Sequence, residues 1–228
     1  MSDSLFIFEN LKTVGFTAGT ILNGTRQGRA EIYDLVKDRF PAVKKTIVSP
    51  LQTHGAEIVF IGDGSETDNI NADGVLSDSG EMCLTIRTAD CVPILLADPS
   101  TGIFGAVHVG WRGLVTGIIE ELTARIDENG LRADSIRIGL GPSIGKCCFE
   151  TGDEVAILFE ESSVSMKQEA LLVDLRGAVM EKLTAAGIEA NNIENVDDCT
   201  VCSGDKYPSY RRTGDASIQM VNFIFRSG

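Results

Sequence analysis

Basic residues are scarce in this sequence, and their scarcity limits its partners. Lys and Arg number 20 against 33 Asp and Glu, which gives a net charge of −13 over 228 residues. Affinity for a nucleic-acid backbone depends on clustered Lys and Arg, so we expect no nucleic-acid partner. An anionic substrate would need a local arginine pocket to overcome the overall negative charge.

Long apolar runs and a basic N-terminal segment are also lacking. No run approaches the roughly 18 uninterrupted apolar residues of a membrane span, and the opening MSDSLFIFEN does not resemble a secretion signal. We therefore expect a soluble, cytoplasmic protein with no membrane partner. In that compartment the six cysteines indicate reduced core thiols, metal ligands or nucleophiles rather than a disulfide framework.

The chain lacks internal repeats and low-complexity linkers as well. Its length and its 43% hydrophobic residues fit one large domain, which we expect over residues 1–228. Helical periodicity marks 114–130 and 175–187, and Asp174 is placed to cap the second of these helices. Apolar, β-branched runs predict strands: two runs around a loop within 46–62, and further runs at 82–98, 102–111 and 218–225.

The order of these elements predicts the fold class. The runs 82–98 and 102–111 are joined by turn residues, so we expect them to form neighbouring strands. Strands and helices do not alternate regularly along the chain. This predicts a layered α+β fold, with a mixed β-sandwich flanked by helices, rather than a Rossmann domain.

Both histidines and one cysteine lie in turn-like segments at the ends of apolar runs: His54, Cys91 and His108. If these segments converge, they supply two imidazoles and one thiolate, the ligand set of a catalytic zinc ion with an open fourth position. The three residues are far apart in the sequence. From spacing alone, hydrogen-bonded loop histidines and a core cysteine are therefore the stronger interpretation.

The same residues allow a second chemistry. Cys91 and His108 could act as the nucleophile and general base of an amide hydrolase, with the amides of Gly-Trp-Arg-Gly or Gly-Pro-Ser-Ile-Gly as an oxyanion hole. That reaction requires surroundings that favour a thiolate. The neighbouring Asp90 opposes this requirement by raising the pKa of the thiol.

The remaining cysteines and the arginines give weaker indications. Cys199 and Cys202 form a C-x-x-C pair, but no second pair or histidine lies near it in the sequence, and the adjacent Cys147–Cys148 favours packing against the core. Arg112 and Arg211 could bind an anion through bidentate guanidinium contacts. Surface ion pairs are an equally good interpretation for a single arginine in an acidic protein.

Six motifs together resemble one known family. In chain order they are QTHG, ADGV, TADCVPILL, AVHVGWRGL, GPSIGKCCFE and SYRRTGD. From about Pro50 onward the chain is similar to the YfiH family, also called the multicopper polyphenol oxidase or laccase-domain family. The resemblance implies a mixed α/β sandwich distantly related to the deamidase domain of cytotoxic necrotizing factor. It also implies a Zn²⁺ ion held by His54, Cys91 and His108.

Members of the family that are similar to this chain act on purine nucleosides. The resemblance implies phosphorolysis of adenosine, inosine, guanosine and methylthioadenosine, with adenosine deamination as a further candidate activity. Purine nucleosides and phosphate are the partners that follow. From residue type we assign phosphate binding to Arg112 and Arg211, and proton handling to Asp90 or Asp73.

Two features qualify the resemblance. A multicopper oxidase needs many imidazole ligands, so two histidines argue against copper oxidation despite the family's label. Members also carry an arginine where this chain has Gly19. This departure leaves a non-catalytic, zinc-binding domain as an alternative beside the phosphorylase and the amide hydrolase.

Overall fold

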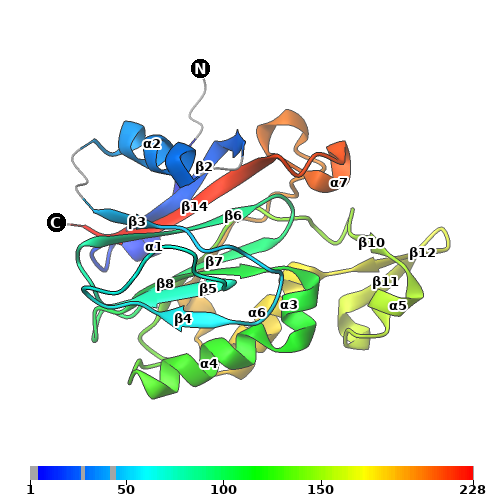
Figure 1. The fold of residues 1–228 in the computed structure, drawn as a ribbon. Helices are drawn as coiled ribbons and strands as arrows, with labels where there is room; N and C mark the ends of the chain where they lie inside the picture. The colour runs from blue at the N-terminus through cyan, green and yellow to red at the C-terminus, as the bar shows by residue number, and fades with distance from the viewer. Residues whose placement is uncertain (1–4, 27–28, 42–44, 228) are drawn as a thin grey trace.

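Two large β-sheets and one small sheet make up the framework of the molecule (Figure 1). The computed structural model describes residues 5–26, 29–41 and 45–227. The first sheet has the strand order β1 (Leu5–Ile7), β2 (Phe16–Arg26), β14 (Ile218–Arg226), β6 (Met82–Thr88) and β3 (Thr46–Val48). The second has the order β13 (Ile193–Asn195), β9 (Arg137–Leu140), β7 (Val92–Ala97), β8 (Phe104–Val109), β5 (Gly74–Ser77) and β4 (Ile58–Phe60). The small sheet has the order β10 (Glu150–Thr151), β12 (Ala170–Val173) and β11 (Val164–Lys167).

The two large sheets pack face to face through apolar side chains. Leu84 of β6 and Ile224 of β14 belong to one buried cluster with Leu95 of β7 and Ala106 of β8. Most strand pairs are antiparallel, but β3 with β6, β4 with β5 and β9 with β13 are parallel. The layered α+β arrangement with mixed sheets, which the sequence predicts, is therefore confirmed.

Helices cover the outer faces of this sandwich. Ile119 and Leu122 of α4 pack with Val107 of β8 against the second sheet, while Ile32 of α2 packs with Phe223 of β14 on the outer face of the first. The helices of the described residues are α1 (Glu9–Lys12), α2 (Arg29–Arg39), α3 (Trp111–Thr116), α4 (Ile118–Glu128), α5 (Asp153–Ala156), α6 (Leu175–Ala185) and α7 (Tyr210–Thr213). Because both faces of β7 and β8 are covered, every residue of these two strands is buried.

One predicted strand run divides between the two large sheets. The run 82–98 becomes β6 in the first sheet and β7 in the second, and the chain reverses between them at Asp90, which has a positive φ of 88°. The two runs predicted within 46–62 become β3 in the first sheet and β4 in the second. The expected pairing of neighbouring strands is confirmed for β7 and β8, with Pro93 opposite His108. The segments that cross between the sheets carry Cys91 and His54.

Glycine and aspartate set the limits of the predicted helices. The predicted helix 114–130 is interrupted at Gly117, whose left-handed backbone (φ 98°) ends α3 and begins α4 at a new angle. Asp174 caps α6 as predicted, because its side chain accepts a hydrogen bond of 2.9 Å from the backbone N–H of Gly177.

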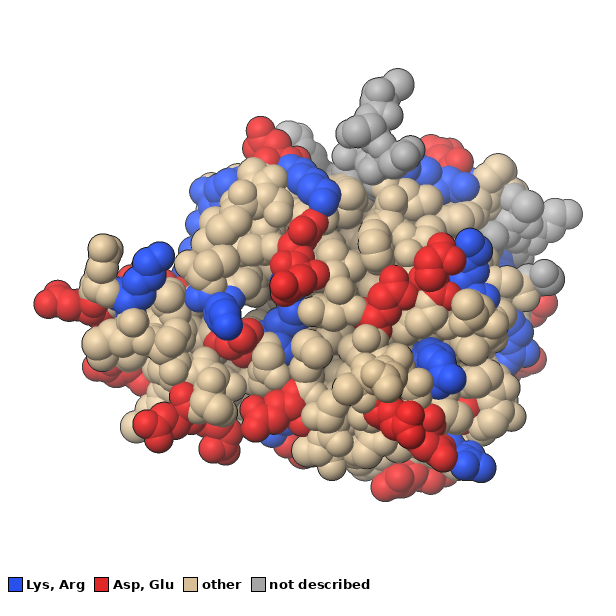
Figure 2. Space-filling view, turned by 180° about the vertical axis from the view of Figure 1, so that it is seen from behind, with Lys and Arg blue, Asp and Glu red and all other residues tan. Residues whose placement is uncertain are grey.

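The visible face in Figure 2 carries both signs of charge, with Asp and Glu side chains spread among smaller groups of Lys and Arg. This distribution agrees with the net charge of −13. Within the described ranges, no helix combines the length and hydropathy needed to cross a membrane.

Candidate metal centre and substrate pocket

His54, Cys91 and His108 come together from three segments of the chain. His54 lies between β3 and β4 with a left-handed backbone (φ 59°), Cys91 lies in the turn between β6 and β7, and His108 lies in β8. Their possible ligand atoms all lie within 4.8 Å of one another. The two imidazole rings meet edge to face, with centroids 4.8 Å apart. The structure thus brings the three predicted metal ligands into one cluster.

The buried carboxylate of Asp73 organises this cluster. It accepts hydrogen bonds from the backbone N–H groups of Thr53 (3.1 Å), His54 (3.0 Å) and Gly55 (2.7 Å). Its Oδ1 also lies 2.8 Å from Nδ1 of His108, which leaves Nε2 as the ring nitrogen for a metal. Burial opposes ionisation of Asp73, but hydrogen bonds with His108 and Gly55 lower its pKa. This geometry suits a positioning residue, in place of the proton handling assigned from residue type.

The cluster also favours the thiolate form of Cys91. Burial opposes ionisation, but the charge and hydrogen bonding of His108, together with His54, lower the pKa of the thiol to about 6. Burial likewise lowers the pKa of His108, whereas Cys91 and Asp73 outweigh that effect and raise it to about 9. A thiolate beside two imidazoles is a donor set that Zn²⁺ prefers.

Gly110 lies between β8 and α3 and is required for close packing around the cluster. A Cβ atom at this position would lie 3.1 Å from Nδ1 of His54 and 3.3 Å from Sγ of Cys91. The backbone of Gly110 is ordinary extended chain (φ −84°, ψ 167°). Space beside the cluster, rather than backbone conformation, therefore explains the glycine.

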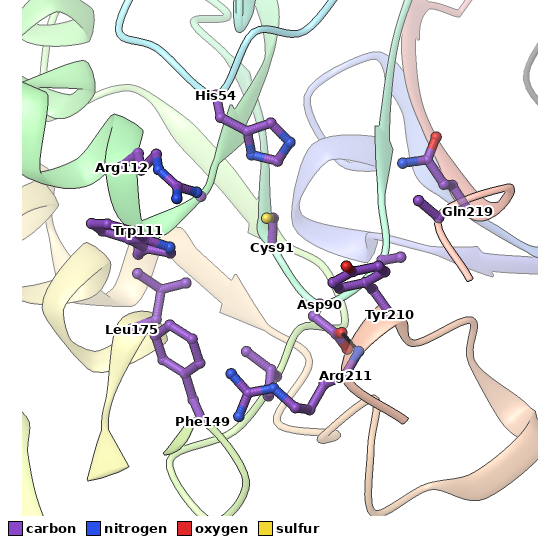
Figure 3. A pocket seen from close by; sticks show the side chains of 14 residues that line it. His54, Asp90, Cys91, Trp111, Arg112, Phe149, Leu175, Tyr210, Arg211 and Gln219 are labelled. Atoms are coloured by element: carbon purple, nitrogen blue, oxygen red, sulfur yellow. Dashed lines mark hydrogen bonds between the residues drawn. The ribbon is translucent and has the colours of Figure 1, made fainter. Parts of the chain in front are cut away.

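A pocket of about 420 Å³ lies beside the cluster (Figure 3), and its volume is typical of small-molecule sites. His54 and Cys91 both line it, so the cluster faces the cavity. Trp111, Phe149 and Leu175 supply an apolar and aromatic wall, and Tyr210 and Gln219 lie on the other side of Cys91 in Figure 3. The pocket thus combines an apolar surface with a possible metal centre.

Arg112 and Arg211 line the same pocket from different segments. The guanidinium carbon of Arg112 lies 4.3 Å from the centroid of the Trp111 ring. That of Arg211 lies 5.5 Å from the Phe149 ring, and its Nη1 donates a 3.1 Å hydrogen bond to the carbonyl of Cys148. Stacking on an aromatic ring orients a guanidinium group while leaving N–H donors available to an anion.

Asp90 lines the pocket, and both of its carboxylate oxygens accept hydrogen bonds. The Thr200 hydroxyl donates to Oδ1 (2.5 Å), and the backbone N–H of Arg211 donates to Oδ2 (2.7 Å). The carbonyl oxygen of Asp90 accepts a third bond from the N–H of Ile144 (2.8 Å). Asp90 therefore connects the turn that carries Cys91 with the segment that carries Arg211.

The pocket residues Phe149, Leu175 and Gln219 are among those that the sequence did not identify as functional. Phe149 is the ninth residue of the motif GPSIGKCCFE, and this was the sequence's indication of its place. Leu175 is the first residue of α6 and Gln219 lies in β14. Neither differs in the sequence from an ordinary core or strand residue.

Gly19, where the resemblance led us to expect an arginine, lies in β2 opposite Ile7 of β1. A Cβ atom at Gly19 would overlap the carbonyl oxygen of Phe6. Strand β1 therefore occupies the space that a side chain at this position would need. Gly19 is not among the residues that line the pocket.

Comparison with known proteins places these features in context. A family model described as multi-copper polyphenol oxidoreductase laccase matches residues 26–227. A protein named adenosine deaminase RL5, from an unknown prokaryotic organism, is 32% identical over 196 residues, which cover 79% of this chain and 75% of that protein. A purine nucleoside phosphorylase of Aquifex aeolicus is 34% identical over 193 residues, which cover 84% and 89%.

Solved structures share the fold. The hypothetical protein YfiH of Bacillus licheniformis superposes with a TM-score of 0.88 at 24% identity, covering 99% of this chain and 97% of that one. YlmD of Geobacillus stearothermophilus gives a TM-score of 0.85 at 24% identity, with 100% and 98% covered. The arrangement of sheets and helices described above is therefore that of a known fold.

Proposed function

The chain belongs to the laccase-like YfiH family, and from this premise we propose that it is a zinc-dependent purine nucleoside phosphorylase, with adenosine deamination as a second activity. Its substrates are adenosine, inosine, guanosine and methylthioadenosine, together with phosphate. The observation that carries the proposal is one pocket lined both by the histidine–cysteine cluster and by two arginines. Relatives named adenosine deaminase and purine nucleoside phosphorylase support the choice of substrate class.

His54, Cys91 and His108 fit a zinc ion better than a set of copper ions. Two imidazoles and a thiolate, with the buried Asp73 carboxylate behind one imidazole, match a three-ligand zinc centre that keeps one position open. A multicopper oxidase also needs a trinuclear cluster, and the sequence holds no further histidine for it. Bound zinc would supply Lewis acidity for a substrate oxygen or a water molecule.

Arg112 and Arg211 are the residues we propose for phosphate. Among the described residues, no carboxylate or other acceptor engages the Arg112 guanidinium, so its donors face the pocket without a competing partner. Arg211 uses one nitrogen for the Cys148 carbonyl and keeps the others. Guanidinium groups bind phosphate in bidentate fashion, which offsets the repulsion that an acidic protein exerts on an anion.

The aromatic wall is the surface we propose for the purine. Trp111 and Phe149, each with an arginine stacked on it, present flat faces that a base can pack against. Phosphorolysis breaks the bond between C1′ of the ribose and the purine nitrogen and forms a C1′–O bond to phosphate. The departing purine takes up a proton, which hydrogen phosphate loses as it becomes the ester and which a pocket carboxylate can relay. Of the two carboxylates considered, Asp90 lines the pocket and Asp73 does not, so we assign this proton transfer to Asp90.

Product analysis tests the proposal. Purified protein is incubated with adenosine, inosine or methylthioadenosine, with and without phosphate, and the products are identified by mass spectrometry alongside metal analysis. We expect free base and ribose 1-phosphate, or its methylthio form, only when phosphate is present, and inosine from adenosine in either condition. Inactivity toward all three nucleosides would favour the non-catalytic domain, and turnover by zinc-free protein would contradict the metal role.

The lowered pKa of Cys91 keeps the amide hydrolase as a second candidate. In such an enzyme Cys91 is a free nucleophile, whereas in our proposal it is a metal ligand. Iodoacetamide separates the two, because a zinc-bound thiolate is shielded from alkylation. Alkylation of Cys91 in zinc-loaded protein would favour the hydrolase.

A further inference from the structure

A second group of sulfur atoms gathers outside the cluster described above. Cys147 and Cys148 lie in the turn between β9 and β10, and Cys199 and Cys202 lie in the loop that follows β13. Although the two pairs are far apart in the sequence, their four sulfur atoms all lie within 4.8 Å of one another. The C-x-x-C pair that lacks a partner in the sequence therefore has one in space.

The spacing of these sulfurs matches metal ligands rather than disulfide partners. Sγ of Cys202 lies 3.5 Å from Sγ of Cys147 and 3.3 Å from Sγ of Cys148. A disulfide would place two sulfurs about 2.05 Å apart. Four sulfurs around a zinc ion, with Zn–S bonds of about 2.3 Å, form a tetrahedron whose edges are about 3.8 Å long.

The surrounding backbone favours a thiolate at Cys199. The N–H of Gly145 donates a hydrogen bond to Sγ of Cys199 at 3.2 Å. A backbone N–H that points at a sulfur atom stabilises the thiolate, which is the form that binds a metal.

The neighbourhood also supplies positive charge. A zinc ion with four thiolates has a net charge of −2, which must be balanced nearby. Lys146 precedes the cysteine pair, the Arg211 side chain donates to the Cys148 carbonyl (3.1 Å), and that of Arg212 donates to the Thr200 carbonyl (2.8 Å). Three cations therefore lie in, or bind to, the two loops that carry the sulfurs, while the two carboxylates before Cys199 are each paired with a further cation: Asp197 with Arg176 (3.0 Å) and Asp198 with Lys206 (2.6 Å).

We propose that these four cysteines hold a second zinc ion in a closed, structural Cys₄ site. Because all four positions are filled by protein, this ion has no place for substrate and takes no part in the reaction. The proposal goes beyond the phosphorylase function and does not depend on it.

The site would secure one wall of the pocket. Ser143 and Cys199 form an isolated parallel bridge, with the N–H of Thr200 donating to the Ser143 carbonyl (3.1 Å). The buried Arg176 side chain binds the same two loops, through the Ser143 carbonyl (3.0 Å) and the Asp198 carbonyl (2.8 Å). The metal would extend this link to the segment that presents Phe149.

Zinc stoichiometry tests the proposal directly. The full-length protein is loaded with zinc under reducing conditions, freed of excess metal and analysed for zinc per chain. We expect two ions in the natural protein, one in Cys199→Ser/Cys202→Ser and one in His54→Ala/His108→Ala. Cys83→Ala is the matched control, since Cys83 is buried in β6 away from both clusters, and it should keep two ions.

X-ray absorption at the zinc edge on His54→Ala/His108→Ala gives a readout that needs no cysteine variant to fold. We expect four sulfur neighbours at about 2.3 Å and no nitrogen or oxygen neighbour. A zinc count that does not fall in Cys199→Ser/Cys202→Ser, a mixed ligand shell, iron in place of zinc, or disulfides among these cysteines in freshly reduced, zinc-treated protein would each overturn the proposal. These readouts are independent of nucleoside turnover, so failure of the phosphorylase proposal would leave this one standing.

Discussion

Asp73 is the residue on which the geometry of the candidate metal centre depends most. Its buried carboxylate accepts a hydrogen bond from the backbone N–H of His54 and also lies within hydrogen-bond distance of the His108 ring. Two of the three proposed ligands are therefore positioned by a single charge that never enters the pocket. Partners of this kind orient a ligand imidazole and increase its basicity.

Replacing Asp73 by Asn should weaken zinc binding at this centre by about 10- to 100-fold. The amide cannot accept all the hydrogen bonds that the carboxylate accepts, and its NH₂ group would face backbone donors. Competition with a chromophoric chelator measures the affinity. Asp134→Asn is the control, because Asp134 is exposed and pairs only with Arg132. Unchanged affinity in Asp73→Asn would contradict the positioning role.

Arg112→Gln should reduce kcat/KM for phosphate by roughly 10- to 100-fold, since hydrogen bonds to charged groups contribute about 1.5–3 kcal/mol each. Adenosine deamination uses water instead of phosphate, so it should change little in the same variant. Steady-state kinetics of both reactions measure the difference. Arg132→Gln, which alters an exposed arginine outside the pocket, serves as the matched control. An equal loss of both activities would argue against a phosphate-specific role.

At the scale of elements, the site depends on where the chain passes from one sheet to the other. β3 and β6 lie in the first sheet, β4 and β7 lie in the second, and the two crossing segments carry His54 and Cys91. β8 pairs with β7 and brings His108 beside them. Because β3 and β6 pair in parallel, their C-terminal ends lie at the same end of the first sheet, and both crossing segments start there.

Gly110→Ala should impair zinc binding without a comparable loss of stability in zinc-free protein. The added methyl group would lie too close to the His54 ring and the Cys91 sulfur, yet the backbone conformation suits any residue. Zinc titration and thermal unfolding of the metal-free protein measure the two effects. Gly62→Ala, where a Cβ atom has no neighbour closer than 3.9 Å, is the control. A large loss of stability in the zinc-free variant would contradict this explanation.

Local chemistry allowed some elements to be predicted and not others. The cap at Asp174 and the hairpin of β7 and β8 depend on neighbouring residues, so the sequence indicates them directly. The division of 82–98 between two sheets depends on one positive φ at Asp90, which no apolar pattern reveals. Convergence of the three proposed ligands followed from family resemblance, since only the tertiary fold brings such distant residues together.

The four-cysteine cluster is a second feature that local sequence does not indicate. Each pair looks incomplete in the sequence, because a metal site is recognised there by the spacing of all its ligands. Here the two pairs meet only because β13 pairs in parallel with β9 and sends its following loop beside the one after β9. No periodicity or turn pattern near Cys147 or Cys202 encodes that contact.

At the scale of the whole molecule, metal binding should contribute to stability as well as to chemistry. Both clusters join segments that are distant in the sequence, so an ion in either one restricts relative movement of those segments. A ligand that binds only the folded state stabilises it by an amount that grows with the logarithm of the free-ligand concentration relative to Kd. The acidic composition adds to this need, because self-repulsion of like charges opposes compactness.

Removing zinc with a chelator should therefore lower Tm. Free zinc at about 1,000 times Kd stabilises the folded state by about 4 kcal/mol. For a chain of this size, each kcal/mol of stability raises Tm by about 2–4 °C. Each occupied site should therefore raise Tm by about 8–16 °C. Scanning fluorimetry measures the shift. A variant combining His54→Ala, His108→Ala, Cys199→Ser and Cys202→Ser should not respond to the chelator, and a response would show that zinc binds elsewhere.

The position of β14 determines the order in which the molecule can be completed during synthesis. This strand lies between β2 and β6 and pairs with both, yet it follows every other strand of the two large sheets in the sequence. Until then β2 and β6 have no common neighbour, and the apolar faces that Val221 and Phe223 later cover stay open to water. The second sheet is already complete at β13, so it can assemble first. Because Gln219 of β14 lines the pocket, a nascent chain can complete this pocket only after β14 has been synthesised.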